Sequence, residues 1–335
     1  MVTDDVSLPS DLIVLARGQA GYVSTAQVSG CRISDRRFRQ LVHAGRLVRV
    51  MRGVYDTGVL SRDLRERHPY DRERRRSVRR ALVAYANGAA VGAGALALHG
   101  VRGLPRVITV EVAMRGGGYA QPRGDIRVRQ IDLRGNTVRI EGAPVARLPV
   151  AFVQALDTLD RESWVACAND ALRRGLTTGV ELADALHAGR ARRGVARRRH
   201  WFGLTNKLLE SPLETRAWLA LWDADIVPDE LQRDIHAPDG RFLGRADMAW
   251  YLGRGRWLLV EIDGSEHHSS TSQLAADAVR QNGVLNQLRY RLLRYRAPQL
   301  FPPDGFVAEI EAVLREEAWT SGRQVPGPTS VITST

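Results

Sequence analysis

The chain has 335 residues, of which 49 are Lys or Arg and 37 are Asp or Glu, giving a formal net charge of +12. A hydrophobic share of 44% excludes a wholly disordered chain, and the length allows about two or three domains. The two cysteines, Cys31 and Cys167, lie too far apart in the sequence to suggest a disulfide framework or a cysteine zinc site, which indicates a reducing cytoplasm.

The positive charge is concentrated in the front of the chain. Residues 1–210 hold 36 basic and 20 acidic side chains, a balance of +16. Residues 211–335 hold 13 basic and 17 acidic ones, a balance of −4. Such a basic front predicts contact with a polyanion, and the acidic back predicts a different task.

Secretion and membrane insertion are not expected. The first residues, MVTDDVSLPSD, are acidic and lack an apolar segment. Residues 81–101 contain no Asp, Glu, Lys or Arg and have about the length of a membrane-spanning helix. They are mostly Ala and Gly, which give little transfer free energy, so packed helices around a glycine-rich turn are expected there. The sequence predicts a cytoplasmic protein that does not contact a membrane.

Residues 1–60 are expected to form a winged helix-turn-helix domain. Asp11 and Ser34 are favourable N-cap residues for its first and third helices, and a short second helix is expected between them. Two short strands at 47–50 and 54–55 would form a hairpin wing.

The third expected helix carries residues suited to DNA recognition. Phe38, Leu41 and Val42 form one apolar face, and Gly45 is placed to end the helix. In units of this kind the third helix enters the major groove and the wing lies on the DNA backbone. The alternative is that the arginines are simply the solvated side of an amphipathic helix. The residues predicted to bind double-stranded DNA are Arg36, Arg37, Arg39, Gln40 and Arg52.

Residues 61–80 carry nine arginines against four acidic residues. Two interpretations are open for this run. The arginines would contact DNA phosphates, or they would form a solvated helix face with ion pairs between positions i and i+4.

Residues 61–190 are expected to form a middle α+β domain, followed by a basic linker at 191–207. No metal-ligand spacing, phosphate-binding loop or nucleophile motif occurs in this domain. The expected elements are strands within VITVEVAM, IRVRQI and TVRI and helices at 150–160, 161–175 and 179–188.

Residues 208–318 are expected to form an α/β domain with a mixed sheet, followed by a disordered tail at 319–335. Its first helix begins with a capping box, in which Ser211 is the N-cap and Glu214 is the third helical residue. The other expected elements are strands at 242–252, 257–264 and 290–295 and helices at 272–288 and 306–318.

Carboxylates gather at the ends of two of these strands. Asp247 lies on the first, and Glu261 and Asp263 share one face of the second because side chains alternate along a strand. Burying several carboxylates together is costly unless a cation neutralises them, and Mg²⁺ prefers oxygen ligands. We therefore predict a Mg²⁺ site at Asp247 and Glu261. The other candidate catalytic residues are Asp263, His267 or His268 as the group that transfers a proton, and Glu214 from the first helix.

At these residues the chain resembles the PD-(D/E)xK nuclease superfamily, and within it the branch related to very-short-patch-repair endonucleases. The resemblance covers residues 208–315 and rests on SPLETRAW, GRADMAW, VEIDG with EHH, and YRLLRY. It implies a restriction-endonuclease-like fold in which Asp247 and Glu261 bind a divalent metal. The superfamily's lysine would fall at position 263, which is Asp here, and Asn282 stands where relatives often carry an acid.

The front of the chain is similar to the AbiEi antitoxin family of type IV toxin–antitoxin systems. This resemblance covers residues 10–190 and rests on TAQVSG, RQLVHAGRLVRVMRGVY, ALHGVRGLP and DALRRGL. It implies a winged helix that binds operator DNA, a second α+β domain, transcriptional autorepression and a partner toxin.

The sequence thus predicts an α+β protein of several domains, and three functions remain open. The first is a DNA-binding transcriptional regulator or antitoxin with an endonuclease-like C-terminal domain. The second is a Mg²⁺-dependent DNA endonuclease of defence or repair, targeted by the winged helix. The third is a protein that neutralises a toxin without cleaving DNA. The expected partners are double-stranded DNA, a cognate toxin and a second copy of the chain in a homodimer.

Overall fold

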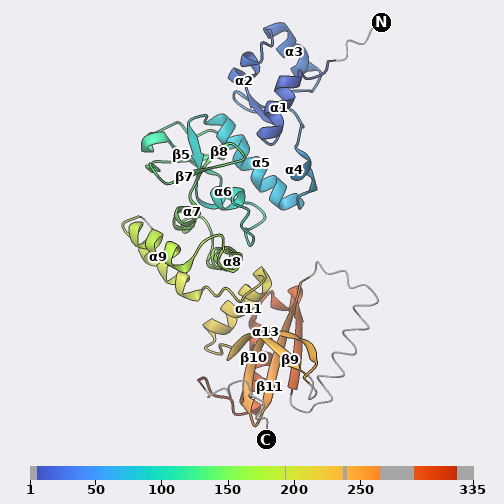
Figure 1. Ribbon diagram of the computed structural model, residues 1–335, viewed down its shortest axis with the longest axis vertical. Helices are drawn as coiled ribbons and strands as arrows, with labels where there is room; N and C mark the ends of the chain where they lie inside the picture. Colours follow the sequence, from blue (N-terminus) through green and yellow to red (C-terminus); the bar gives the residue numbers. More distant parts are fainter. Residues whose placement is uncertain (1–5, 193, 237–239, 265–289, 323–335) are drawn as a thin grey trace, which may run out of the picture. The chain divides into compact units, whose positions relative to one another are not determined.

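The structure of the protein, a computed structural model, divides into two compact units, Met1–Gly203 and Leu204–Thr335 (Figure 1). The described residues hold three separate sheets, of three, five and four strands, so the expected mixed α+β architecture with several domains is confirmed. None of the described helices is both long enough and apolar enough to cross a membrane. The residues described are 6–192, 194–236, 240–264 and 290–322.

Several expected features fall outside these residues. They include both histidines proposed for proton transfer, so the structure places neither of them. The features concerned are His267, His268, the helix at 272–288, Asn282 and most of the tail at 319–335.

Short helices and a three-stranded sheet form the N-terminal part of the first unit. The Ser34 side chain accepts the N–H of Arg37, so the predicted N-cap is confirmed, and Gly45 follows the helix with φ +67°. Asp11 does not cap its helix, which begins one residue earlier, but lies in the first turn. Both outer strands of the sheet pair antiparallel with β3. The elements are α1 (Ser10–Gly18), β1 (Tyr22–Ser24), α2 (Thr25–Gly30), α3 (Asp35–His43), β2 (Val48–Met51) and β3 (Val54–Asp56).

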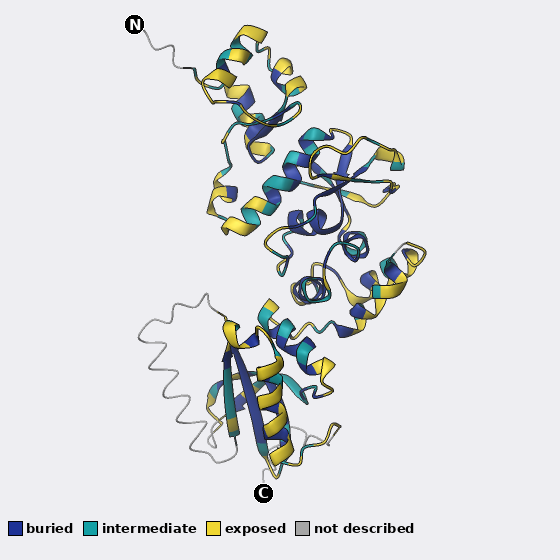
Figure 2. Ribbon diagram, turned by 180° about the vertical axis from the view of Figure 1, so that it is seen from behind, coloured by how far each residue is buried: buried dark blue, intermediate teal, exposed yellow. Residues whose placement is uncertain are grey.

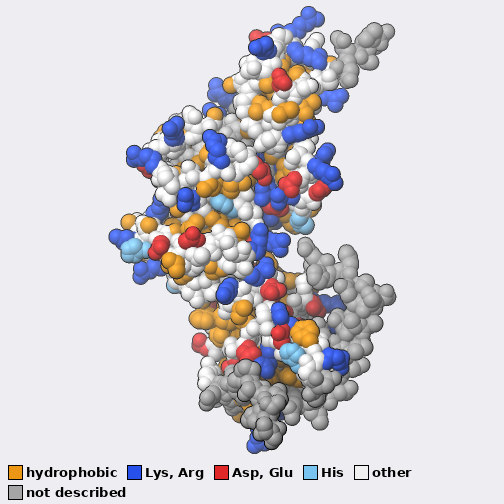
Figure 3. All heavy atoms as spheres, viewed as in Figure 1, with side chains coloured by type: hydrophobic (Ala, Val, Ile, Leu, Met, Phe, Trp, Pro, Cys, Tyr) orange, Lys and Arg blue, Asp and Glu red, His pale blue; other side chains and the backbone are white. Residues whose placement is uncertain are grey.

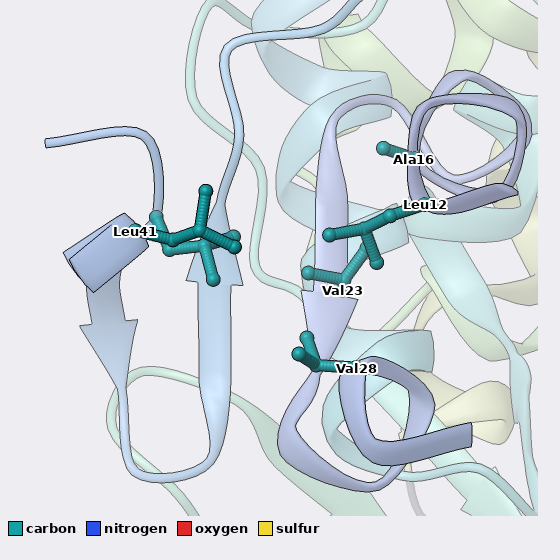
Figure 4. Packing of buried hydrophobic residues seen from close by; sticks show 6 residues of the cluster. Leu12, Ala16, Val23, Val28 and Leu41 are labelled. Carbon is teal, nitrogen blue, oxygen red and sulfur yellow. The ribbon is translucent and has the colours of Figure 1, made fainter. Parts of the chain in front are cut away.

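Side chains from all three helices and from β1 meet in one small core (Figure 4). From α3, Phe38 and Leu41 contribute as predicted, and the Phe38 ring packs edge-on against Tyr55 with 5.2 Å between centroids. Val42 is exposed instead, because it lies about 100° further around the helix than Leu41. The buried members of the core are Leu12, Ala16, Val23, Val28, Leu41 and Leu47.

The rest of the first unit holds a five-stranded sheet with helices. Its strand order is β6-β5-β4-β8-β7. The helices expected at 161–175 and 179–188 are present, and Thr178 caps the second of them in a full capping box. The Ala- and Gly-rich segment 81–101 contains a buried strand as well as a helix, where only packed helices were expected. The elements are α4 (Arg62–Glu66), α5 (Pro69–Ala84), β4 (Gly88–Ala90), α6 (Gly92–Leu98), β5 (Glu111–Met114), η1 (Arg115–Gly117), β6 (Arg127–Arg129), β7 (Thr137–Ile140), β8 (Ala143–Ala146), α7 (Leu148–Ala155), α8 (Arg161–Arg173), α9 (Gly179–Ala188), α10 (Val195–Arg198) and η2 (Arg199–Leu204).

Most arginines of the basic run at the start of this region are bonded within the first unit. Nη2 of buried Arg79 donates to the backbone oxygens of Ile140 and Glu141, each at 3.1 Å, and to the Glu141 carboxylate at 2.8 Å. Arg80 donates to both carboxylate oxygens of Asp125 at 2.7 Å. In α5, therefore, the arginines of residues 61–80 mainly form hydrogen bonds and ion pairs that hold the helix against the neighbouring loops. The arginines engaged in this way, or in ion pairs within α4 and α5, are Arg62, Arg67, Arg72, Arg74, Arg75, Arg76, Arg79 and Arg80.

A four-stranded mixed sheet forms the centre of the second unit, as expected. Its order is β12-β11-β10-β9, with β11 and β12 parallel and the other neighbours antiparallel. The Tyr295 ring packs edge-on against Phe306 with 4.7 Å between centroids, and Figure 2 shows buried strands beside a helix whose outer side is exposed. Strand β9 was not expected. The elements are α11 (Pro212–Asp223), β9 (Glu230–His236), β10 (Phe242–Gly253), β11 (Arg256–Asp263), β12 (Tyr290–Arg296), η3 (Ala297–Leu300) and α13 (Asp304–Glu316).

Candidate functional site

The outer side of α3 presents part of the predicted DNA-binding set. Arg36 and Arg39 are exposed, and Gln40 is half-buried. Nε of Arg39 donates to the backbone oxygen of Asp35 at 3.3 Å. Since side chains three positions apart project from the same side of a helix, the two exposed arginines lie on one side of α3. Such groups can donate to phosphates or to guanine edges.

The other two predicted arginines have different surroundings. Arg37 is half-buried, and its Nη2 donates to the backbone oxygen of Ser7 at 3.1 Å, which holds the segment before α1. Arg52 is exposed in the turn between β2 and β3, beside Gly53, whose φ is +75°. The structure therefore leaves Arg36, Arg39 and Arg52 at the surface and gives Arg37 a tethering contact.

Two further exposed arginines, one just after α3 and one on β2, were not predicted. Arg46 follows α3, where its N–H bonds to the backbone oxygen of Leu41 at 2.9 Å, and Arg49 lies on β2. The residues LVRV were interpreted only as a strand, so the arginine among them was not considered for DNA binding. In Figure 3, several basic side chains lie on the visible face of the N-terminal part. A separate count of the basic residues between α3 and β3 would have found Arg46 and Arg49.

In the second unit, two of the predicted carboxylates are neighbours across strands. Met248 of β10 pairs with Val260 of β11, so Asp247 and Glu261, one residue further along, face each other. Asp263 lies at the end of β11 and is exposed. The structure thus brings Asp247 and Glu261 together and leaves Asp263 at the surface.

Glu214 also reaches this site, because it does not complete the expected capping box. Ser211 accepts the N–H of Glu214 at 3.1 Å, as an N-cap should. Among the described residues, however, Oε2 of Glu214 accepts the N–H of Glu210 at 2.9 Å and the side-chain amide of Gln232 at 3.0 Å. The donor from β9 directs Glu214 toward the sheet, so only half of the box forms.

The carboxyl group of Asp247 is strongly perturbed. Its pKa is raised from 3.8 to about 7, first by burial and then by the negative charges of Glu214 and Glu261. The N–H of Ile262, 2.7 Å from Oδ2, and the amide of Gln232, 3.5 Å from Oδ1, work in the opposite direction. A carboxyl group in this situation gains strongly from a nearby cation.

Glu261 already has a cationic neighbour. It is only 6% exposed and pairs in register with Arg294 of the parallel strand β12. Nε of Arg294 lies 2.7 Å from Oε2 of Glu261. Neither Gln232 nor Arg294 was predicted, because the strands that carry them lie far from the VEIDG motif in the sequence and only the sheet register brings them together.

The metal prediction has a chemical basis, but the described residues do not supply a complete ligand set. Among the described residues, no group of three or more His, Cys, Asp or Glu side chains is arranged to hold a metal ion. Asp247 and Glu261 supply the carboxylate oxygens that Mg²⁺ takes, and they leave room in its coordination shell for water. The Mg²⁺ site at this pair stays a prediction.

One comparison with known proteins bears on the N-terminal part. Residues 10–55, which run from α1 to β3, match the model of a family described as transcriptional regulator, AbiEi antitoxin. Two proteins of Mycobacterium tuberculosis, from strains CDC 1551 / Oshkosh and ATCC 25618 / H37Rv and each described as uncharacterized, are 28% identical to the chain over 142 residues. The matched stretch is 42% of this chain and 51% of each relative, so the chain spans about half the length of the curated relatives it matches. Residues 10–55 are therefore similar to this regulator and antitoxin family.

Proposed function

We propose that the protein is a DNA-binding transcriptional regulator of the AbiEi antitoxin type, which reads double-stranded DNA with α3 and contacts the backbone with the β2–β3 hairpin as a winged helix. The observation that carries this proposal is the match of residues 10–55 to the AbiEi regulator family. The matched residues include Arg36 and Arg39, which are exposed on one side of α3.

The chemistry of the segment supports this role. Arginine recognises both phosphate oxygens and guanine. Arg46, Arg49 and Arg52 add exposed positive charge after α3 and on the hairpin. A cognate toxin and a homodimer belong to the same proposal. Two copies would read two half-sites related by symmetry.

The test measures binding of the full chain to the DNA upstream of its own gene, by fluorescence anisotropy in buffers of increasing salt. Arg36→Ala with Arg39→Ala should lower the affinity at least about tenfold, since each charge-assisted contact is worth about 1.5–3 kcal/mol. Arg17→Ala, an exposed arginine in the last turn of α1, is the matched control and should change the affinity little. Equal affinity of the wild type and the double variant would overturn the proposal.

A second candidate function is Mg²⁺-dependent cleavage of DNA by the second unit, with a restriction-endonuclease-like fold. The favouring observation is the buried carboxyl of Asp247, whose pKa is raised to about 7 between Glu214 and Glu261. A divalent cation there would release the proton, activate a water molecule and stabilise charge on the phosphate. Asp263, and His267 or His268, remain the candidates for proton transfer.

Cleavage is tested with supercoiled plasmid and purified full-length protein in Mg²⁺, in Mn²⁺ and in EDTA. Asp247→Asn and Glu261→Gln should abolish metal-dependent nicking. The matched control is Asp234→Asn, because Asp234 is a β9 carboxylate that pairs with Arg245 at 2.7 Å outside the carboxylate site. Nicking that persists equally in all variants would come from a contaminant and would reject the site.

A further inference from the structure

We propose that Arg294 is the phosphate-binding residue of the carboxylate site and takes a nucleic-acid phosphate group beside Glu261. The proposal rests on the second candidate function above, which places nucleic-acid chemistry at this sheet. It goes further by assigning the group that would hold the scissile phosphate.

The sheet register places Arg294 in one row with the carboxylates. Glu261 pairs with Arg294 across β11 and β12, and Asp247 lies opposite Glu261 on the other side. On β9, Leu231 pairs with Met248, so Gln232 is the neighbour of Asp247. Each strand of the sheet thus contributes one polar side chain to a row that runs amide, carboxylate, carboxylate, guanidinium.

The guanidinium of Arg294 has N–H groups that form no hydrogen bond with any described residue. Its Nε lies 2.7 Å from Oε2 of Glu261, yet this ion pair is not a directed hydrogen bond. Both Nε and Nη2 are buried without a hydrogen-bond acceptor in the described part of the chain. A buried N–H without an acceptor costs free energy, and the Arg294 side chain is still 24% exposed, so an acceptor from outside that reaches the guanidinium would be bound favourably. A phosphate group offers several charged oxygens in a geometry that suits a guanidinium fork.

The carboxylates of the row favour a cation beside them. Asp263, two residues after Glu261 on β11, adds an exposed carboxylate. In the described residues of the row, Arg294 is the group with a fixed positive charge. Without a bound metal ion, an anionic phosphate approaching Glu261 would otherwise meet a negative charge, which opposes binding.

The experiment uses the full chain and 5′-thymidine monophosphate as the phosphate probe, with thymidine as the probe that lacks the phosphate. Binding is measured by titration calorimetry in Mg²⁺ and in EDTA. Arg294→Met should weaken binding of the monophosphate at least about tenfold, the loss expected for charge-assisted hydrogen bonds. Arg294→Lys, which keeps the charge beside Glu261 but lacks the fork, should lie between wild type and Arg294→Met. Thymidine should bind weakly and equally to all three proteins.

Arg291→Met is the matched control. Arg291 lies on the same strand, three residues earlier, and pairs with Glu316 at 2.8 Å in an exposed ion pair. Any contribution from α3 is identical in all these proteins, so the comparison isolates position 294. Affinity for the monophosphate equal to wild type in Arg294→Met, an equal loss in Arg291→Met, or no binding by the wild type would each overturn the proposal.

Two further measurements keep the outcomes separate. Circular dichroism and tryptophan fluorescence identify a variant that has not folded, and Arg294→Lys then carries the test. Manganese binding, measured by electron paramagnetic resonance, reports on the carboxylates alone. A wild type that binds no Mn²⁺ would reject metal-dependent cleavage, while the titrations in EDTA would still decide the role of Arg294.

Discussion

Arg76 of α5 donates a hydrogen bond from Nη2 to the Asp56 carboxylate at the end of β3. The same guanidinium donates through Nε to the backbone oxygen of Ala20 at 3.2 Å and lies over the Tyr22 ring, 4.8 Å from its centroid. One side chain of α5 therefore holds the end of β3 and the start of β1. The N-terminal helices are fixed to α5 by this contact as well as by the covalent chain.

This contact predicts a measurable coupling. Arg76→Ala and Asp56→Ala should each lower the free energy of unfolding by about 1–3 kcal/mol, because each leaves a half-buried charge without its partner. A double-mutant cycle from chemical unfolding should give an interaction energy of about 0.5–3 kcal/mol. Arg62→Ala is the control, since the exposed Arg62–Glu66 pair should contribute at most about 1 kcal/mol. An interaction energy of zero in the double-mutant cycle would contradict the coupling between Arg76 and Asp56.

Replacement of Gly92 by alanine should destabilise the first unit by more than backbone strain alone. Gly92 has φ +55°, and a Cβ there would lie 2.7 Å from Oε2 of fully buried Glu111. Gly135 has φ +73° and no atom within 4 Å of such a Cβ, so Gly135→Ala measures the strain by itself. We expect about 1–2 kcal/mol for Gly135→Ala and about 2 kcal/mol more for Gly92→Ala, compared by thermal unfolding. Equal losses would show that Glu111 moves aside at little cost.

The pKa of Asp247 predicts a pH-dependent stability in metal-free buffer. Burial raises this pKa from 3.8 to about 7, so between these values the folded state keeps a proton that the unfolded chain has released. The group's effect on stability therefore becomes more unfavourable as the pH rises from about 4 to 7, and is constant above that range. Asp247→Asn removes this penalty and should stabilise the second unit by about 1–4 kcal/mol at pH 8, and by less at pH 5.

The matching measurement is urea unfolding in EDTA followed by tryptophan fluorescence. Five of the seven tryptophans lie after residue 203, so the signal reports mainly on the second unit. Adding Mg²⁺ should reduce the advantage of Asp247→Asn if the cation binds the wild-type carboxylates. A stabilisation that is the same at pH 5 and pH 8 would place the pKa of Asp247 near its ordinary value.

The salt dependence of DNA binding should separate α3 from α5. Arg36→Ala removes an exposed guanidinium and should reduce the slope of log Kobs against log salt by about 0.9, the value for one phosphate contact. Arg80→Ala should leave the slope unchanged, because Asp125 already holds that guanidinium through two hydrogen bonds. Anisotropy titrations at four or more salt concentrations give both slopes. A slope that responds to Arg80 but not to Arg36 would move the DNA-binding surface to α5.

Local signals in the sequence predicted much of the fold. Ser34 and Thr178 cap helices as expected, because an N-cap depends on residues only three apart. The hairpin strands lie within one residue of the expected positions. The three-residue strands β1 and β4 were missed, since each is too short for a periodic pattern and forms by pairing with a distant segment.

The candidate site was predicted in part for the same reason. Asp247 and Glu261 follow from two strands and their alternation, which are local features. Gln232 and Arg294 become their neighbours only through the register of a mixed sheet, and no spacing along the chain encodes that register. Glu214 was predicted both as a capping residue and as a candidate site residue, and a donor from β9 competes for its side chain.

The arginine contacts of α5 also determine which substitutions the chain tolerates. Changing Arg74, Arg75, Arg76, Arg79 and Arg80 to lysine would keep every formal charge, yet an ammonium group is a point donor and cannot reproduce a planar fork that reaches several oxygens. Arg79 alone joins two backbone oxygens and a carboxylate. The chain has a single lysine, Lys207, among its 49 basic residues. In α5 at least, lysine could not replace arginine without loss of contacts, because the planar guanidinium forms several of the bonds that hold the helix in place.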